Sequence, residues 1–484
     1  MLVAKRVDLG FGLTQFSDPL HFSSIHLIQG TLNLDNSSTV SSLQADRLQL
    51  SQMALRRSEG EWPLQAQHVN GGIIPWQPEA EKQPDRQIQF QLSAGSLQVK
   101  GLPAENVLIE GRLTGHDWTI DNLGADVARG TLTAEAKRSA AGLWQIGNLR
   151  LNGIRLQSDK TLSDYIQPLL TLPDVQLNRV DITNTRLEGK NWAITDLDLV
   201  VKHLTLHAGS WQSDGGSLAM NASSFVNGSL QLDDPIIGLD FSPQGVEINR
   251  FSSRWVNGLI RAAGNWDRTS KTLSLDEVAI AGLEYTLPSN WRERWMTSLP
   301  DWLSSVEVSR FNANRNLIID VSPAFPFQMT ALDGTGSKLL LAKNHQWGIW
   351  AGTLSLNAAE ATFNRIDLRY PSLTLAADDK SINVTEMSAF SSGGMLELTA
   401  SITQRPDRAL SFTLNGRQVP VNLLQNWGWP QLPAGKGNFQ LDGQAALQRD
   451  RTLKETVNAT LSATPADTPL LQRMTNGVVV DSDR

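Results

Sequence analysis

The sequence predicts a mainly β protein, an elongated antiparallel sheet folded over lengthwise, with a few short helices. Apolar and polar residues alternate in short segments almost from end to end, for example at 88–92 and 230–232, and a period of two is typical of strands with one buried face. Turn residues separate these segments, which favours a meander over βαβ units. Because no linker interrupts the pattern across 484 residues, we expect one extended sheet. An ordinary antiparallel sandwich would show the same one-sided alternation and remains an alternative.

The stretch 411–447 is the clearest unit of this pattern. Apolar and polar residues alternate over 411–419 and again over 437–443. Between the two segments, Pro420 suits the first position of a short helix, where a missing N–H costs nothing. The Trp-Gly-Trp-Pro run at 427–430 would end that helix. We therefore predict a strand, a short helix and a second strand.

A weak internal repeat consists of a glycine followed by an alternating strand that closes on small residues. The spacing between its copies is irregular, so a solenoid with a fixed period is not supported. Gly153 lies where the apolar positions switch from one face to the other, which predicts a bulge or bend there. The four copies begin at Gly130, Gly216, Gly258 and Gly394.

Two further segments have helical character. Residues 162–172 are expected to form a short helix, and residues 290–306 place several tryptophans near one face. Pro300 would divide the second helix into two short pieces. We expect residues 1–463 to form one elongated β-rich body and residues 464–484, with two prolines and a polar end, to form a flexible tail.

Composition excludes several classes of protein. The chain has 42 basic and 49 acidic residues, a net charge of −7, and no basic block, so a nucleic-acid partner is not expected. It has no cysteine, which excludes disulfides and thiolate metal sites. No window approaches the length of a membrane span, and the N-terminal residues read as a strand already under way rather than as a signal peptide.

No arrangement of residues typical of catalysis, metal binding or cofactor binding is found. His203 and His207 would share one strand face without a nearby carboxylate, so solvent-facing polar positions are the simpler interpretation. The glycines at 334–336 and 435–437 lack the third glycine and the helix of a phosphate loop. The acid pair at 233–234 lies in turn-like surroundings. The sequence therefore predicts a protein that is not an enzyme and carries no metal or cofactor.

Tryptophan is the one unusual feature of the composition, with 15 residues against three tyrosines. Tryptophan favours places that are apolar at one end and wet at the other, such as membrane interfaces and the rims of lipid grooves. Packing of a helix on a sheet is the simpler interpretation for any one of them. The candidates for a rim are Trp291, Trp295, Trp302, Trp427 and Trp429.

Several segments together have a familiar sequence, at 7–9, 22–34, 125–132, 281–288, 315–320 and 414–430. A looser feature, Gly-x-Gly-x-Phe-x-Leu, appears at 435–441. With these segments the chain resembles the AsmA family of bacterial envelope proteins over essentially its whole length.

The resemblance implies an inner-membrane protein with an N-terminal anchor and a long periplasmic β-rich body. Relatives look like bridge-type lipid carriers, in which a curved, taco-like sheet forms an apolar groove for acyl chains. Relatives have also been tied to the assembly or targeting of envelope proteins. The anchor and the first strands are missing from this sequence, so membrane attachment is an expectation for the anchored protein.

The leading hypothesis is a β-groove that binds or conducts phospholipid between the inner and outer membranes, with acyl chains on its apolar face. The alternative is a factor that regulates the targeting or assembly of envelope proteins by protein–protein contact. The apolar strand positions predicted to line the groove are Leu132, Leu149, Leu218, Leu396, Leu398, Phe412, Leu414, Phe439 and Leu441.

Overall fold

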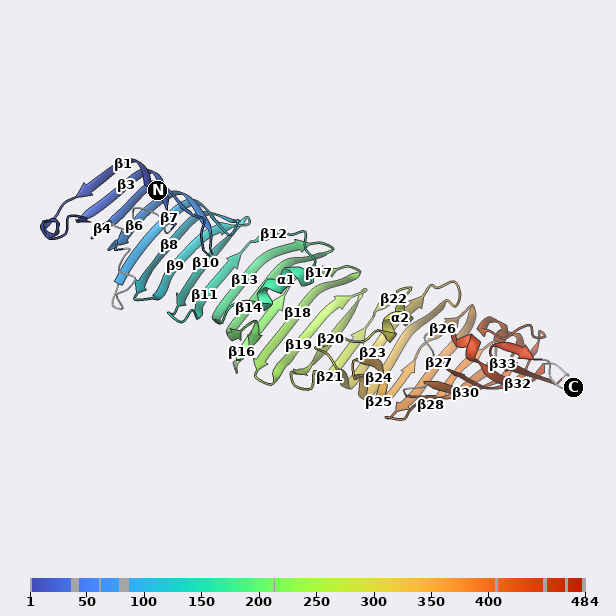
Figure 1. The fold of residues 1–484 in the computed structure, drawn as a ribbon. Helices are drawn as coiled ribbons and strands as arrows, with labels where there is room; N and C mark the ends of the chain where they lie inside the picture. The colour runs from blue at the N-terminus through green and yellow to red at the C-terminus, as the bar shows by residue number, and fades with distance from the viewer. Residues whose placement is uncertain are drawn as a thin grey trace. The chain divides into compact units, whose positions relative to one another are not determined.

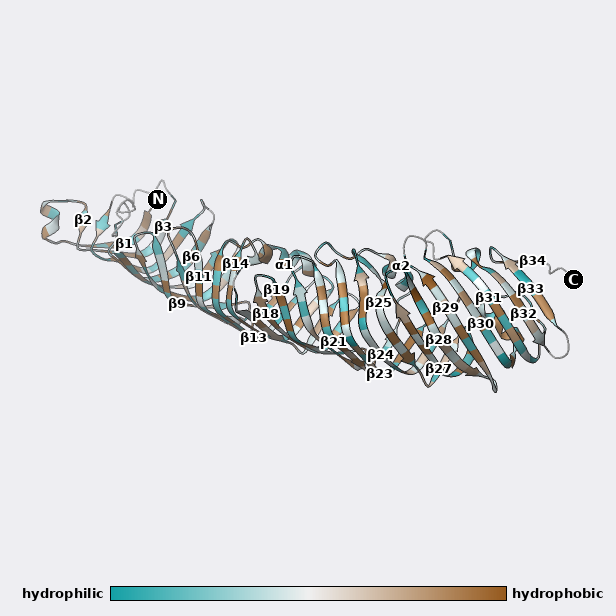
Figure 2. Ribbon diagram, turned by 90° about the horizontal axis from the view of Figure 1, so that it is seen from below, coloured by the Kyte–Doolittle hydropathy of each residue, from teal (hydrophilic) through white to brown (hydrophobic). Residues whose placement is uncertain are grey.

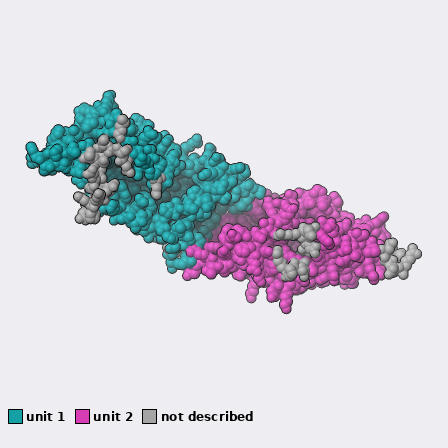
Figure 3. Space-filling model, viewed as in Figure 1, with its two compact units in different colours: residues 1–243 teal, residues 244–484 magenta. Residues whose placement is uncertain are grey.

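The computed structural model describes residues 2–35, 43–60, 62–77, 87–212, 214–404, 408–446, 451–465 and 469–480. Its contacts divide the chain into two compact units, Met1–Pro243 (unit 1) and Gln244–Arg484 (unit 2), coloured separately in Figure 3. The continuity of residues 1–463 as one elongated body stays a prediction.

The described residues of unit 1 form mainly strands, together with the helix α1 and the 3₁₀ turn η1 (Figure 1). Its elements are β1 (Leu2–Gly10), η1 (Leu13–Phe16), β2 (His21–Phe22), β3 (Ser24–Asn33), β4 (Gln44–Ala45), β5 (Leu48–Arg57), β6 (Leu64–Ile74), β7 (Gln87–Val99), β8 (Leu102–Thr114), β9 (Asp117–Val127), β10 (Gly130–Arg138), β11 (Trp144–Asn152), β12 (Arg155–Gln157), α1 (Leu162–Leu170), β13 (Val175–Gly189), β14 (Trp192–His207), β15 (Ser210–Trp211), β16 (Gly216–Asn221), β17 (Ser224–Asn227) and β18 (Leu230–Ser242).

Unit 2 has the same character. Its elements are β19 (Gly245–Trp255), β20 (Gly258–Asp267), β21 (Thr272–Ala281), β22 (Glu284–Thr286), α2 (Trp291–Met296), β23 (Ser305–Asp320), β24 (Phe327–Lys343), β25 (Gln346–Asn357), β26 (Glu360–Phe363), β27 (Ile366–Ala377), β28 (Ser381–Ser391), β29 (Gly394–Thr403), β30 (Ala409–Pro420), η4 (Val421–Trp427), β31 (Lys436–Ala446), η5 (Leu453–Thr456), β32 (Asn458–Pro465), β33 (Leu470–Thr475) and β34 (Val478–Val480).

Strand pairing confirms the predicted mainly antiparallel β fold and corrects one part of it. Successive strands pair antiparallel through most of each unit, as in β6–β7–β8–β9 and β27–β28–β29–β30. Crossovers interrupt this meander, because β11 and β12 pair parallel with β13, and β21 and β22 pair parallel with β23. A parallel pair needs a connection that returns to the starting edge of the sheet, and α1 and α2 lie in these two connections.

Each strand has one apolar face, which we call the inner face, and a polar outer face. In Figure 2 apolar and polar bands alternate along the strands. Along β14 the inner positions include Leu197, Val201 and Leu204, which are all buried. The change of parity between Val201 and Leu204 occurs where His203 has a φ of +53°. Bulges of this kind keep apolar side chains on the inner face of a long, bent strand.

The four glycine repeats all begin strands, as predicted. Gly130 and Gly258 follow two-residue turns, Ala128-Arg129 and Val256-Asn257, whose φ angles are all positive. Turns of this form match the right-handed twist of a hairpin. A Cβ atom on Gly130 would lie 2.3 Å from the carbonyl oxygen of Asn152, so only glycine fits there.

The predicted bend at Gly153 is confirmed, and the same device recurs in unit 2. Gly153 separates β11 from β12 with a φ of +68°, and Gly282 separates β21 from β22 with a φ of +65°. The N–H of Gly153 donates to the carbonyl of Thr183, and the N–H of Gly282 donates to that of Asn314. Each bend therefore leads into a parallel crossover with equivalent hydrogen bonds.

The helical predictions are confirmed in part. Residues 162–170 form α1, but the expected second helix is present only as α2, and residues 305 and 306 already belong to β23. The segment after Pro420 forms the 3₁₀ helix η4. In the part of the chain that the structure describes, no helix is long and apolar enough to cross a membrane.

The flexible tail predicted for residues 464–484 is wrong for its described part. Strand β33 pairs with β32 and β34 pairs with β33. Met474 is buried in the core of unit 2, so the alternation at 470–475 is that of a half-buried strand. The two prolines lie at the ends of these strands, where they remove no ladder hydrogen bond within β33.

Replacing Asn316 with leucine is expected to lower the free energy of unfolding by about 1–3 kcal/mol. The Asn316 side chain is completely buried, accepts a hydrogen bond from the N–H of Leu283 and donates one to the carbonyl of Leu332. Leucine would leave both main-chain groups buried without a partner. Urea unfolding measures this loss of unfolding free energy. Asn314→Ala, on the exposed side of the same strand, is the control. Equal losses in the two variants would contradict this role.

Candidate functional site

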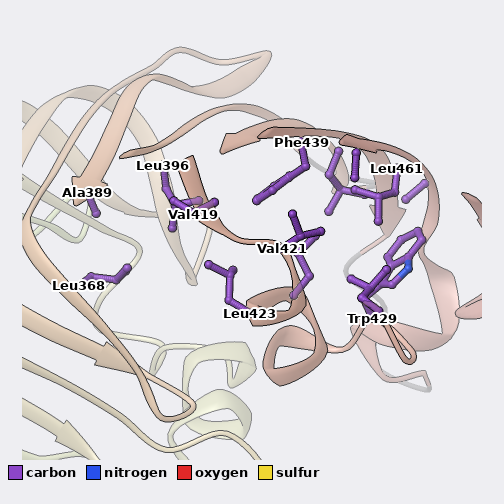
Figure 4. Packing of buried hydrophobic residues seen from close by; sticks show 14 of the residues in the cluster. Leu368, Ala389, Leu396, Val419, Val421, Leu423, Trp429, Phe439 and Leu461 are labelled. Atoms are coloured by element: carbon purple, nitrogen blue, oxygen red, sulfur yellow. The ribbon is translucent and has the colours of Figure 1, made fainter. Parts of the chain in front are cut away.

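The candidate site lies in unit 2 beside a packed core that η4 closes. Pro420 precedes η4 with a φ of −62°, and Gly428 ends it in the left-handed region with a φ of +110°. Glycine adopts that conformation without strain, which allows the chain to turn back at this point. The buried side chains of η4 are Val421, Leu423 and Leu424. Figure 4 shows Val421 and Leu423 facing Phe439 and Leu461 across this core.

Two phenylalanine–glycine pairs determine the shape of the inner face of β30 and β31. Phe412 lies opposite Gly443, and Gly416 lies opposite Phe439. A Cβ atom on Gly443 would lie 2.4 Å from the ring of Phe412, and one on Gly416 would lie 2.3 Å from the ring of Phe439. Each ring therefore lies flat over a glycine of the neighbouring strand, which leaves space above it. The Leu414–Leu441 pair lies between these two pairs in the ladder, so this face is apolar along the whole run.

An apolar cavity of about 340 Å³ opens on this inner face. It lies within the usual size range of ligand pockets. Glu397 and Ser388 contribute mainly main-chain atoms, because alternation directs their side chains to the outer face. The residues that line it are Phe325, Phe363, Leu368, Met387, Ser388, Ala389, Leu396, Glu397, Leu398, Ala400, Leu410, Phe412, Leu414 and Trp427.

This cavity differs from its larger neighbour in the polarity of its lining. A larger cavity of about 650 Å³ lies beside the same strands, and polar side chains such as Thr399, Thr413 and Asp442 contribute to its lining. Thr413 donates a hydrogen bond to Asp442 at 2.8 Å. Ala400 and Phe412 contribute to both cavities. Elsewhere on β30 a single residue step, from Leu414 to Thr413, moves from the apolar lining to the polar one.

A hydrogen-bonded clamp fixes one side of the apolar cavity. The Asn426 side chain donates to the main-chain carbonyl of Asn364 at 3.0 Å, and the Asn364 side chain donates to the carbonyl of Asn426. The indole N–H of Trp427 donates to the carbonyl of Phe363 at 2.9 Å. These bonds hold η4 against the β26–β27 turn, and they place Trp427 and Phe363 in the cavity wall.

The nine residues predicted to line a groove separate into three groups. Leu396, Leu398, Phe412 and Leu414 come together in the cavity. Phe439 and Leu441 are buried in the core that η4 covers and do not line it.

The remaining three predicted residues belong to unit 1. Leu149 and Leu218 pack against the buried cluster of Val180, Val201 and Leu204. Leu132 is half-buried and lies opposite Leu151 and Ala125 in the ladder. These three positions share an apolar face but lie outside the cavity.

Sequence reasoning missed several residues of the cavity. Met387 and Leu410 belong to alternating strands, so the same pattern could have found them. Phe325 lies in a loop and Phe363 at a strand end, where alternation carries no information. Trp427, a candidate for the rim of a lipid groove, lies in the wall of the apolar cavity, and its indole N–H is hydrogen-bonded. Trp429 is instead buried in the core and donates to Gln472, as the packing interpretation holds.

The site presents an apolar binding surface. The cavity wall is apolar, and hydrogen bonds already occupy the indole N–H of Trp427. In the ranges that the structure describes, no group of three or more histidine, aspartate or glutamate side chains could hold a metal ion. His203 and His207 are both exposed, as predicted. The expectation that no carboxylate lies nearby is wrong for His207, which pairs with Asp174 at 2.7 Å.

Comparisons with known proteins give the family. The AsmA family model matches residues 18–461. The curated AsmA family protein YicH of Escherichia coli (strain K12) is 50% identical over 482 residues, which is 99% of this chain and 85% of the relative. No solved structure is significantly similar to the chain. Because the family match covers most of the sequence, the chain belongs to the AsmA family.

Proposed function

We propose that this protein is a non-enzymatic lipid-binding protein of the bacterial envelope. In this proposal its apolar inner face takes the acyl chains of phospholipids and conducts them between the inner and outer membranes. It acts at the periplasmic face of the inner membrane, held there by an anchor of the kind that the family resemblance implies. The observation that carries the proposal is the cavity between β27, β30 and Trp427, whose wall is apolar.

The energetics favour an acyl chain as the occupant. Moving apolar groups from water into such a cavity contributes about 0.8 kcal/mol per CH₂. A phosphate head group would lose its hydration there without gaining a charged partner, because the wall presents none. The head group therefore stays outside while the chain enters.

A second candidate function is contact with an envelope protein. Strand β34 pairs with β33 on one side, and no partner on its other side is found among the described residues. Val478 is 68% exposed. An open, apolar strand edge can take up a strand of another chain.

Photo-crosslinking tests the lipid proposal. Benzoylphenylalanine replaces Leu398 in the cavity wall or, as the control, the exposed Thr399 on the outer face. The full chain is incubated with vesicles of phosphatidylethanolamine and phosphatidylglycerol, irradiated and analysed by mass spectrometry. We expect phospholipid adducts at position 398 and none at 399. No lipid adduct at 398 in the folded variant, or equal adducts at 398 and 399, would overturn the lipid proposal.

A further inference from the structure

A pocket of about 400 Å³ lies in unit 1, where the turn before β10 meets β12 and β13. It forms beside the bend between β11 and β12, where the N–H of Arg155 donates to the carbonyl of Ala128 at 2.8 Å. Beyond this bend β12 pairs parallel with β13 (Figure 1). Three separate segments of the chain therefore contribute to one pocket. Its lining consists of Arg129, Arg155, Leu156, Gln157, Arg186 and Glu188.

The lining carries an excess of positive charge. Its one acidic residue, Glu188, forms an ion pair with Arg186. The Arg155 guanidinium donates to the main-chain carbonyls of Ile154 and Asn184, which fix its position and leave its charge in place. Neither Arg155 nor Arg129 has a carboxylate partner among the described residues. Three arginines and one glutamate therefore leave two positive charges without a counter-charge.

The strand register brings two of these arginines face to face. Arg155 lies opposite Arg186 in the parallel ladder, and Gln157 lies opposite Glu188. Like charges that lie opposite one another on neighbouring strands are destabilising. One carboxylate serves only one of the two guanidinium groups. An anion bound between them would convert this repulsion into attraction.

Unit 2 has the same main-chain arrangement at the bend between β21 and β22, without the arginines. The N–H of Glu284 donates there to the carbonyl of Val256 at 2.8 Å, which is the contact that Arg155 makes in unit 1. Leu317 lies opposite Glu284 in the ladder, so leucine occupies the place of Arg186. The bend therefore forms without a pair of arginines.

The turn beside the bend differs between the two units in the same way. Arg129 has a φ of +68°, and Asn257, at the equivalent position of unit 2, has a φ of +67°. Asparagine is several-fold enriched among the residues that adopt this conformation. The Asn257 side chain donates to Glu284 at 3.0 Å, whereas the exposed side chain of Arg129 has no partner among the described residues. Local structure therefore favours asparagine at this turn and does not explain the arginine.

We propose that this pocket binds a phosphate group, either inorganic phosphate or a phosphate monoester, between the guanidinium groups of Arg129, Arg155 and Arg186. A guanidinium presents a planar fork of N–H donors that matches the oxygens of a phosphate. Because it has five such donors, Arg186 can hold a phosphate oxygen while it pairs with Glu188.

The charge of the pocket favours phosphate over a carboxylate. A phosphate monoester carries about −1.5 to −2 charges at pH 7, which balances the two positive charges of the lining, whereas a carboxylate would balance only one. The inference goes beyond the proposed function and does not depend on it, because this pocket takes an anionic group and the cavity of unit 2 takes a hydrocarbon chain.

Equilibrium dialysis of the full chain against radiolabelled inorganic phosphate tests the site. Arg129→Asn and Arg186→Leu each introduce the residue that unit 2 carries at the equivalent position. We expect saturable binding by the parent chain at low ionic strength, and binding about tenfold weaker or more in each variant, because a hydrogen bond between charged groups is lost. Arg47→Asn, which removes the same charge from an exposed position outside the pocket, should bind like the parent.

Two results would overturn this site. Absence of saturable binding by the parent chain is the first, and equal affinity of the parent and all three variants is the second, because phosphate would then be held elsewhere. Misfolding does not account for a loss in Arg129→Asn, since asparagine suits the φ of this exposed turn. Circular dichroism confirms that each variant is folded.

Sedimentation with vesicles distinguishes the two sources of the phosphate. The full chain and Arg129→Asn are mixed with phosphatidylcholine vesicles that either contain or lack phosphatidic acid, a lipid with a phosphate monoester head group. Binding that requires both phosphatidic acid and Arg129 would identify a lipid head group as the ligand. Phosphate binding in dialysis without such sedimentation would identify a soluble phosphate. Crosslinking at Leu398 reports on the apolar cavity alone, so failure of the proposed function would leave both results unchanged.

Discussion

Replacing Gly209 with alanine is expected to displace the connection between β12 and β13, residues 158–174, which contains α1, and to destabilise unit 1 by about 2–5 kcal/mol. Gly209 has a φ of +77°, where an alanine costs roughly 1–2 kcal/mol. The new Cβ atom would also collide with the main chain of Leu170, which cannot rotate away as a side-chain end can. Forced displacement of packed groups adds about 1–3 kcal/mol.

Gly228→Ala is the matched control for this effect. Gly228 also lies in a turn with a positive φ, +61°, but a Cβ atom there would meet nothing within 4 Å. The Gly228→Ala variant should therefore lose only the free energy that the positive φ costs an alanine, about 1–2 kcal/mol. Urea unfolding gives the loss of unfolding free energy in each variant, and amide hydrogen exchange over residues 158–174 shows whether this connection has opened. If the two variants lose the same free energy of unfolding and amide exchange over residues 158–174 is unchanged, then Gly209 does not hold this connection in place.

Alternation predicted the strands well because it depends only on which side chains face the core. It also located Gly130, Gly216, Gly258 and Gly394, since a glycine is required where a hairpin turn brings two main chains together. The bend at Gly153 was predictable for the same reason. These features are local, and the sequence around each one contains the whole physical cause.

The crossovers were not predictable from alternation, because a period of two does not say which strand pairs with which. Phe412 and Phe439 illustrate the same limit within the site. Both alternate in the same way, yet one lines the cavity and the other lies in the core. The difference comes from η4, which covers β31, and from the Asn364–Asn426 clamp, which joins segments far apart in the chain. Such long-range contacts leave no periodic signal.

Filling the apolar cavity is expected to abolish lipid binding there without unfolding the protein. Ala400 lines the cavity and lies opposite Phe412 in the ladder. In Ala400→Trp the indole would take the space that an acyl chain needs and make apolar contacts with Leu398 and Phe412. The cost of overpacking is about 1–3 kcal/mol, so the fold should survive.

Thr399→Trp is the control, because it adds the same side chain one residue earlier on the exposed outer face. Phospholipid bound after incubation with vesicles, quantified by mass spectrometry, should be lost in Ala400→Trp and unchanged in Thr399→Trp. Since both variants disturb the same strand, a difference between them can come only from the face that the indole occupies. Equal binding in both variants would mean that lipid is held outside this cavity, and the cavity could then not be the observation that carries the proposed function.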